Sequence, residues 1–229
     1  MSLSRAVAVA GLLGGTFDPV HIGHLILAET ARELLALDHV YFVPAGDPPH
    51  KRGAVIAQAQ DRLAMLHLAI DDNPHFSISH IDLDRPGPHY SVDLVQLLQR
   101  QLGAGVELWF LMGLDSLIDL PTWHDPDRLR RLVRLAAATR PGYKVNWAPL
   151  EAVMPGLSRE VTLLPMPGVS IASHNLRQKL EQGRSVRYQV PEAVRQYIRG
   201  HGLYGAAVNG FTPVSLRAPN NMGEVKPAT

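Results

Sequence analysis

A short segment near the N-terminus carries two glycines and two histidines at a spacing that suits the binding of a polyphosphate. Gly14 and Gly15 directly follow the apolar run 6–13, and His21 and His24 stand where the next helical stretch begins. Glycines have no β-carbon, so a phosphate can approach the backbone closely, and a helix N-terminus adds unpaired N–H groups and a positive dipole end. Histidines at this spacing point to one side of a helix. Each part alone suits a structural turn or a surface histidine, but their order after a strand predicts a phosphate site.

The same segment resembles the signature of the HIGH-type nucleotidylyltransferases, because residues 21–24 read His-Ile-Gly-His. Further segments resemble one family of that group, the bacterial nicotinate-nucleotide adenylyltransferases. Together they cover about residues 6–205. They are the Pro-Pro-His-Lys loop at 48–51, the segment 84–91, the Gly-x-Asp block at 110–116 with Trp123 and His124, residues 140–142, residues 171–177 and the ending 188–204.

The resemblance implies an enzyme that transfers the adenylyl group of ATP to nicotinate mononucleotide, giving deamido-NAD and pyrophosphate. The acceptor phosphate is already an anion at neutral pH, so catalysis would consist of alignment and charge stabilisation, without a protein base or nucleophile. The implied catalytic residues are His21, His24 and Arg177, with Arg177 binding the leaving pyrophosphate. Mg²⁺ is expected to bind mainly through ATP oxygens and water, with no set of protein ligands, although Asp18 could assist through water.

The resemblance also implies two groups of binding residues. The ATP group comprises Gly14, Gly15, Thr16, Phe17, His21, His24, Gly113, Ser173 and Arg177. The acceptor group comprises Lys51 for the phosphate, Ser91 for the carboxylate, Asp115 for the ribose, Trp123 for stacking on the pyridine ring, and His124. Arg85, in a Pro-Gly loop, is interpreted as structural or exposed and is left outside the site.

The chain departs from the family pattern in two places. Where the family commonly has Ile-Ser-Ser-Thr-x-Ile-Arg, residues 171–177 read Ile-Ala-Ser-His-Asn-Leu-Arg. Ala172 and His174 therefore replace two hydroxyl side chains, while Ser173 and Arg177 remain, and we interpret His174 as a surface residue. Ser91 replaces the usual threonine and keeps its hydroxyl.

The pattern of apolar residues predicts strands alternating with helices. Strands are expected at 6–13, 40–44, 76–83, 106–112, 132–139 and 161–164, and helices at 22–37, 58–70, 92–101, 173–181 and 191–200. Ser91 and Ser173 are expected to cap the helices that follow them.

This alternation predicts an α/β protein with a doubly wound parallel sheet. The family resemblance implies a Rossmann-like nucleotidylyltransferase fold with a small C-terminal helical part. Ligands on such sheets bind at the carboxyl ends of the strands, where the motifs described above should collect. We expect one domain over residues 1–205. Residues 206–229 hold Pro213, Pro219 and Pro227 with little periodicity and are expected to form a mobile tail.

Composition narrows the class of protein. The formal charge is +1 with 19% charged residues, so no wide basic face is available for nucleic acid or an anionic membrane. Without cysteine, disulfides, thiolate metal sites and cysteine nucleophiles are excluded.

The chain shows no signal peptide and no apolar run near the ~20 residues that span a bilayer. A cytoplasmic protein is expected, with ATP and nicotinate mononucleotide as its partners. The oligomeric state stays open, a homo-oligomer included.

The sequence leaves several alternatives open. The nearest is another HIGH-type adenylyltransferase, with phosphopantetheine or nicotinamide mononucleotide as acceptor; the former enzymes lack the arrangement of Asp115, Trp123 and His124. A class I tRNA synthetase would need a Lys-rich loop and tRNA-binding domains. An NAD-dependent oxidoreductase would need Gly-x-Gly-x-x-Gly in the first turn, which the spacing of Gly11, Gly14 and Gly15 does not supply. A non-catalytic nucleotide-binding module would tolerate the loss of one histidine.

Overall fold

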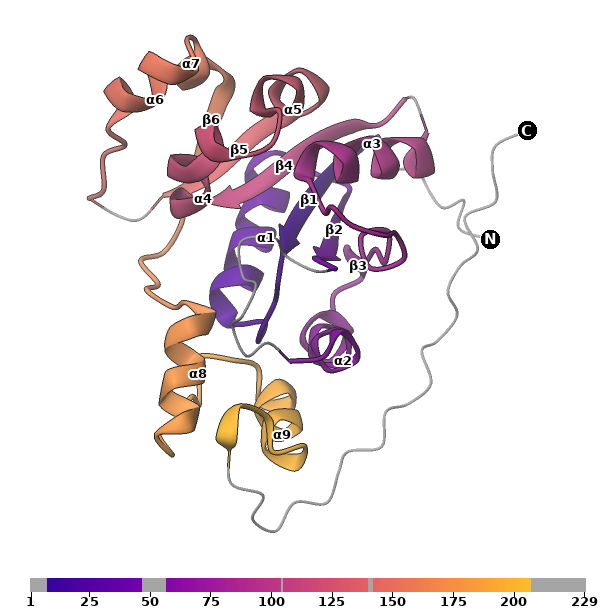
Figure 1. The fold of residues 1–229 in the computed structure, drawn as a ribbon, viewed down its shortest axis with the longest axis vertical. Coiled ribbons are helices and arrows are strands. Elements are labelled where there is room, and N and C mark those ends of the chain that lie inside the picture. The colour runs from indigo at the N-terminus through magenta and orange to yellow at the C-terminus, as the bar shows by residue number, and fades with distance from the viewer. Residues whose placement is uncertain (1–7, 47–56, 104, 140–141, 207–229) are drawn as a thin grey trace.

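The computed structural model describes residues 8–46, 57–103, 105–139 and 142–206, and its centre is a six-stranded sheet (Figure 1). The strand order is β3-β2-β1-β4-β5-β6, and every neighbouring pair is parallel. The predicted α/β class and doubly wound sheet are confirmed. The strands are β1 (Val9–Gly15), β2 (His39–Pro44), β3 (Phe76–Ile78), β4 (Glu107–Gly113), β5 (Arg134–Thr139) and β6 (Val161–Pro165).

Helices cover both faces of the sheet and form a separate hydrophobic core with each. One face carries α1 (Ile22–Leu34), α2 (Ala59–Ile70), α8 (Ser173–Glu181) and α9 (Glu192–Gly200). The other carries α3 (Ser91–Leu102), α4 (Leu114–Asp119), α5 (Pro126–Leu132), α6 (Trp147–Val153) and α7 (Leu157–Glu160). Two short 3₁₀ helices complete the described part, η2 (Leu120–Thr122) and η3 (Leu203–Gly205).

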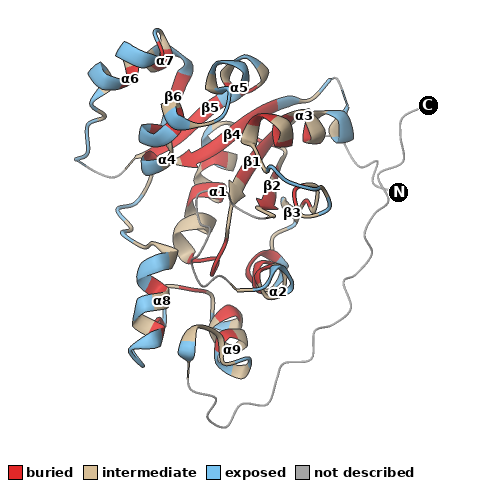
Figure 2. Ribbon diagram, viewed as in Figure 1, coloured by how far each residue is buried: buried red, intermediate tan, exposed pale blue. Residues whose placement is uncertain are grey.

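Strand β4 shows why the central strands are apolar without interruption. Successive side chains of a strand point to opposite faces. Trp109 and Leu111 accordingly belong to the core under α1 and α2, whereas Leu108, Phe110 and Met112 belong to the core under α3 to α5. Figure 2 shows the resulting concentration of buried residues along the sheet and on the inner sides of the helices. A strand covered on both faces needs an apolar residue at every position.

Gly11 has a packing role within this arrangement. A β-carbon at Gly11 would lie 2.8 Å from Cδ1 of Leu37 and 2.9 Å from Cδ1 of Leu111. Two buried leucines thus occupy the space that a side chain would need, so the glycine lets the segment after α1 approach the sheet.

Some predicted boundaries were wrong. The strand expected at 76–83 is only β3, because the chain turns at His80, whose carbonyl accepts the N–H groups of Leu83 at 2.8 Å and Asp84 at 3.0 Å. The helix expected at 22–37 ends at Leu34, and the strand expected at 132–139 begins at Arg134 because α5 continues to Leu132.

The two predicted serine caps were also wrong. Ser91 and Ser173 are the first helical residues of α3 and α8, and the N-cap positions belong to Tyr90 and Ala172, which have extended backbones. The Ser173 hydroxyl donates instead to the carbonyl of Pro19 at 3.0 Å, and thereby ties the start of α8 to the segment between β1 and α1.

In the described part of the chain, none of the helices combines the length and the apolar character that crossing a membrane requires.

Candidate active site

The candidate site lies where the strand order reverses between β1 and β4. The pairing of β1 with β2 continues to Gly15 opposite Pro44, but its pairing with β4 ends at Leu13 opposite Leu111. Gly14 and Gly15 therefore extend beyond the paired part of the sheet on the β4 side. Ligands of open α/β sheets bind in the crevice at such a switch point.

The two glycines belong to the strand and not to a turn after it. Gly14 and Gly15 are the last residues of β1, and the residue with a positive φ is Phe17, at 51°. A β-carbon at Gly15 would lie 3.2 Å from the Phe17 ring, so Gly15 leaves room for that ring. The buried Phe17 ring lies in turn edge-on to His24, with centroids 5.1 Å apart. Phe17 therefore braces the backbone between the glycines and the histidines.

His21 and His24 lie together at the start of α1, as predicted. His21 is the N-cap of the helix, and its backbone N–H donates to Nδ1 of His24 at 3.2 Å. The two rings stack with centroids 3.6 Å apart and planes 18° apart. Because Nδ1 of His24 accepts, the proton of its neutral ring is on Nε2, which becomes a hydrogen-bond donor.

His21 is the more buried of the two histidines. Burial lowers its pKa to about 4. Its Nδ1 is buried and has no hydrogen-bond partner among the described residues. A neutral imidazole at neutral pH with an unsatisfied buried nitrogen fits a site whose polar partner arrives with a ligand.

Arg177 reaches the segment between β1 and α1 from α8. Its Nη1 donates to the carbonyl of Asp18 at 2.7 Å and lies 3.3 Å from Oδ2 of the Asp18 carboxylate. The Ser173 hydroxyl binds the next carbonyl, that of Pro19. The structure therefore brings Arg177 and Ser173 to the segment that links the glycines to the histidines.

Sequence reasoning missed Arg62, a buried arginine of α2 with 3% exposure. Its guanidinium donates to four backbone carbonyls. They belong to Thr16 at 2.9 Å, Ala45 at 2.8 Å, Gly46 at 3.2 Å and Ala57 at 3.3 Å. One side chain thus joins the glycine segment to the residues on either side of 47–56. The only available signal was an arginine among the apolar residues of a helix. A single charged residue in a helix more often lies on its solvated face, so this signal was weak.

On the α3 side, the structure brings the neighbourhoods of two residues predicted for the acceptor, Ser91 and His124, into contact. The Tyr90 ring, next to Ser91, stacks on His124 with centroids 4.0 Å apart, and the half-buried Trp123 lies edge-on to Phe110 at 5.7 Å. The start of α3 and the segment after η2 are therefore in contact. Asp115 is exposed in the first turn of α4, after Gly113 at its N-cap. Lys51, with the rest of the 48–51 loop, and Arg140 and Pro141 lie outside the described residues.

Asp82 organises the loop that leads into α3. Its buried carboxylate accepts from the Gly46 N–H at 3.1 Å and from Arg85 Nε at 2.8 Å, and His89 Nδ1 lies 3.3 Å away. Arg85 also donates to the carbonyl of Pro88 at 2.7 Å. These contacts agree with the structural interpretation of Arg85, and they join the end of β2 to the segment before Ser91.

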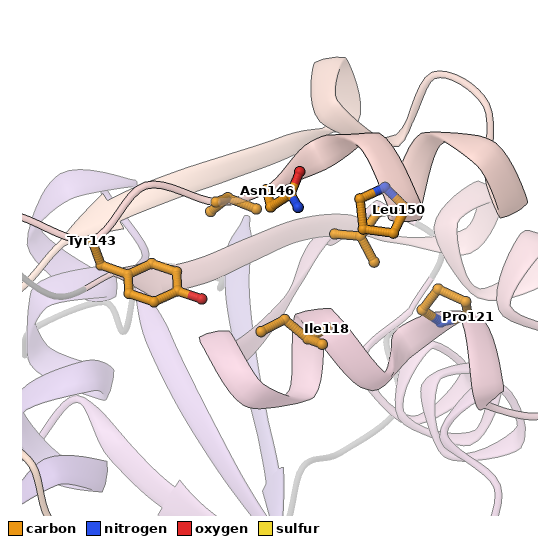
Figure 3. Close-up of a pocket in the computed structure, with 7 residues that line it drawn as sticks. Ile118, Pro121, Tyr143, Asn146 and Leu150 are labelled. Atoms are coloured by element: carbon orange, nitrogen blue, oxygen red, sulfur yellow. The ribbon is translucent and has the colours of Figure 1, made fainter.

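An apolar hollow of about 220 Å³ lies between α4, η2 and the start of α6 (Figure 3). Ile118 and Pro121 of α4 and η2 face Tyr143, Asn146 and Leu150 across it. No residue of the predicted site lines this hollow, and among the described residues no cluster of His, Asp and Glu suited to a metal ion is present.

Comparisons with known proteins agree with this geometry. Residues 12–179 match the Cytidylyltransferase-like family. A probable nicotinate-nucleotide adenylyltransferase from Thermomicrobium roseum is 51% identical over 194 residues, which cover 85% of this chain and 90% of that protein. One from Thermus thermophilus is 45% identical and covers 85% and 98% of the two chains.

This chain belongs to the nicotinate-nucleotide adenylyltransferase family. The resemblance inferred from the motifs is thus confirmed, and a tRNA synthetase or an NAD-dependent oxidoreductase is excluded. Solved structures share the fold. The nicotinic acid mononucleotide adenylyltransferase of Plasmodium falciparum, complexed with NaAD, superposes with a TM-score of 0.71 at 17% identity, covering 87% of this chain and 98% of that one.

The two residues that depart from the adenylyltransferase pattern, Ala172 and His174, both lie at the start of α8. Ala172 supplies the extended backbone of the α8 N-cap without a capping side chain. His174 is exposed on the first turn of α8, in agreement with its interpretation as a surface residue. Ser173 and Arg177 keep the two contacts that hold α8 against Asp18 and Pro19.

Proposed function

We propose that this chain transfers the adenylyl group of ATP to nicotinate mononucleotide, giving deamido-NAD and pyrophosphate. The observation that carries the proposal is the stacked pair of His21 and His24 at a helix N-terminus, directly beyond the glycines at the switch point of the sheet. A helix N-terminus with two ring N–H donors suits the charge of a polyphosphate.

The reaction joins an oxygen of the acceptor phosphate to the α-phosphorus of ATP and breaks the bond between that phosphorus and the oxygen bridging to the β-phosphate. Pyrophosphate leaves with the electron pair of the broken bond. The attacking phosphate is an anion, so no residue has to remove a proton. His24, whose Nε2 carries a proton, and His21 would donate to the α-phosphate and the bridging oxygen as negative charge shifts toward them.

The rest of the ATP site would follow from the geometry around Asp18. Arg177, held against Asp18, would bind the departing pyrophosphate, and backbone N–H groups of residues 14–17 would contact phosphate oxygens. Ser173 would act with the first turn of α8, and Gly113 would leave room for the nucleotide beside the end of β4.

For the acceptor, Trp123 would stack on the pyridine ring, with His124 beside it. Ser91 and the N–H groups of the first turn of α3 would bind the carboxylate, because an anion is favoured at a helix N-terminus. Asp115 would bind the ribose and Lys51 the phosphate. The contact between Tyr90 and His124 supports this grouping, since it brings the start of α3 to the aromatic segment after η2.

We also propose that ATP enters as its Mg²⁺ complex, with the metal bound through phosphate oxygens and water. Mg²⁺ retains several waters and uses few protein carboxylates, and Asp18 is engaged by Arg177, Tyr204 and the Ala57 N–H. A cytoplasmic location is part of the same proposal, as is a single domain over residues 1–205.

A coupled assay tests the proposal. The purified chain is incubated with ATP, Mg²⁺ and one acceptor, and pyrophosphate release is measured together with the mass of the nucleotide product. Nicotinate mononucleotide, nicotinamide mononucleotide and phosphopantetheine are compared at equal concentrations. We expect the highest kcat/KM with nicotinate mononucleotide. Faster turnover of phosphopantetheine, or no turnover with any pyridine nucleotide, would contradict the proposed acceptor.

A further inference from the structure

Tyr204, close to the end of the described chain, contacts a carboxylate next to the candidate site. It lies in η3, and its hydroxyl donates to Oδ1 of Asp18 at 2.6 Å. Its φ of 57° is a left-handed conformation that a side chain disfavours. Burial and the Asp18 carboxylate raise the pKa of Tyr204 far above its usual value, so the phenol keeps its proton and remains a donor.

The two carboxylate oxygens of Asp18 face different groups. Its side chain is 1% exposed, and Oδ1 accepts both the Tyr204 hydroxyl and the Ala57 N–H, the latter at 3.0 Å. Oδ2 has no hydrogen bond among the described residues and lies 3.3 Å from Nη1 of Arg177. The two donors at Oδ1 therefore set the rotation of the carboxylate, and this rotation turns Oδ2 toward the arginine.

Arg177 makes both of its contacts to Asp18 with a single nitrogen. Nη1 donates to the Asp18 carbonyl and faces the carboxylate, so the guanidinium meets Asp18 along one edge. Because the guanidinium is planar, fixing one edge determines where its other N–H groups point. A phosphate bound by those groups would depend on the orientation of Asp18.

We propose that Tyr204 is a positioning residue for ATP: it orients Asp18, and Asp18 holds Arg177 in the plane in which the arginine binds the polyphosphate. The inference rests on the proposed function, in which Arg177 contacts the pyrophosphate part of ATP. It extends the site to the segment after α9, to which sequence reasoning assigned no role.

The chain offers a matched control in Tyr197 of α9. Its hydroxyl also donates to a carboxylate oxygen, Oδ1 of Asp61 on α2, at 2.9 Å. This bond joins α9 to α2 and involves neither Asp18 nor Arg177. Tyr204→Phe and Tyr197→Phe each remove one phenolic hydroxyl from a tyrosine–carboxylate pair, so a general loss of stability affects both variants.

The experiment measures equilibrium binding of the non-reactive analogue α,β-methylene-ATP with Mg²⁺, the KM values for ATP and nicotinate mononucleotide, and Tm. Tyr204→Phe is expected to weaken analogue binding and to raise KM for ATP by about tenfold to a hundredfold, the scale of losing one hydrogen bond to a charged group. KM for nicotinate mononucleotide should stay within about twofold. Tyr197→Phe should leave both KM values and analogue binding unchanged.

A double variant tests whether Tyr204 acts through Arg177. In an Arg177→Lys background, where the planar fork is absent, Tyr204→Phe should cause no further weakening, because coupled residues are not additive. Normal analogue binding by Tyr204→Phe, equal weakening by Tyr197→Phe, or full additivity with Arg177→Lys would each overturn the inference. Analogue binding needs no acceptor, so it distinguishes this outcome from failure of the wild-type chain to turn over nicotinate mononucleotide, which would overturn the proposed function instead.

Discussion

The backbone N–H of His21 donates to Nδ1 of His24 at 3.2 Å, and the two imidazole rings stack on each other. The hydrogen bond assigns the tautomer of His24, since a nitrogen that accepts cannot also carry the proton. His21 is buried, whereas His24 is partly exposed. The two histidines of one motif therefore differ: the tautomer of His24 is fixed by a backbone hydrogen bond, and His21 is the more buried ring.

Removal of His24 is expected to affect catalysis far more than stability. His24→Ala should lower kcat by roughly 10²–10³, the usual scale for losing one preorganised donor to a transition state. Tm should fall only slightly, because the loss of one N-terminal capping bond costs ~1 kcal/mol. His75→Ala is the control, since His75 is exposed and directly precedes β3, at the amino end of the strands, whereas His24 follows the carboxyl end of β1. Near-normal kcat in a folded His24→Ala protein would remove His24 from the mechanism.

The lowered pKa of His21 predicts a loss of stability in acid. The unfolded chain binds a proton at His21 below its ordinary pKa of 6.5, whereas the folded protein binds it only below about 4. The contribution of neutral His21 to the free energy of unfolding is therefore fully present above the unfolded-state pKa. It declines as pH falls from 6.5 toward 4, by about 2 kcal/mol between pH 7 and 4.5. Urea unfolding at both pH values measures this loss, and in His21→Asn it should be smaller by that amount. An equal loss in both proteins would contradict the burial of a neutral His21.

The acceptor side predicts a preference for the acid over the amide. A carboxylate only accepts hydrogen bonds, whereas the amide of nicotinamide mononucleotide also presents two N–H donors that need acceptors. Ser91 and the first-turn N–H groups of α3 suit the anion, and an unmet buried donor costs ~1–3 kcal/mol. The expected ratio of kcat/KM is about tenfold to a hundredfold in favour of the acid.

Trp123→Ala serves as the control for that ratio. Ring stacking should contribute equally to both acceptors, so this variant should raise both KM values and leave the ratio unchanged. Equal kcat/KM for acid and amide in the wild-type chain would indicate a dual-specificity enzyme.

The tail expected from the sequence lies outside the described residues except for Ala206, which packs against the core under α1 and α2. Deletion of residues 207–229 should leave kcat, KM and Tm unchanged, because this segment holds three prolines and little apolar periodicity. Deletion from residue 204 onward also removes Tyr204 and should weaken ATP binding. Loss of activity in the shorter deletion would reveal a docking role for the tail.

The sheet was the most predictable part of the fold. Continuous apolar runs such as 106–112 are required by a strand covered on both faces, and alternation with helices leads to parallel pairing. Shorter elements were not predicted: α4, α6 and α7 have seven residues or fewer, fewer than are needed to show helical periodicity. Serine at a helix start was also misleading, since Tyr90 and Ala172 occupy the N-caps through their backbone conformation alone.

The sequence by itself determined the chemistry of the proposed site, because glycines, histidines and a helix start lie within one continuous segment whose geometry is local. Only the tertiary structure decided how that segment is supported. Arg62 joins a carbonyl of that segment, that of Thr16, to the carbonyl of Ala45 after β2, and Tyr204 reaches Asp18 across 186 residues. A buried charged group must find its partners wherever the packed elements place them, and the packing of α2, α8 and η3 around one carboxylate leaves no periodic pattern in the chain.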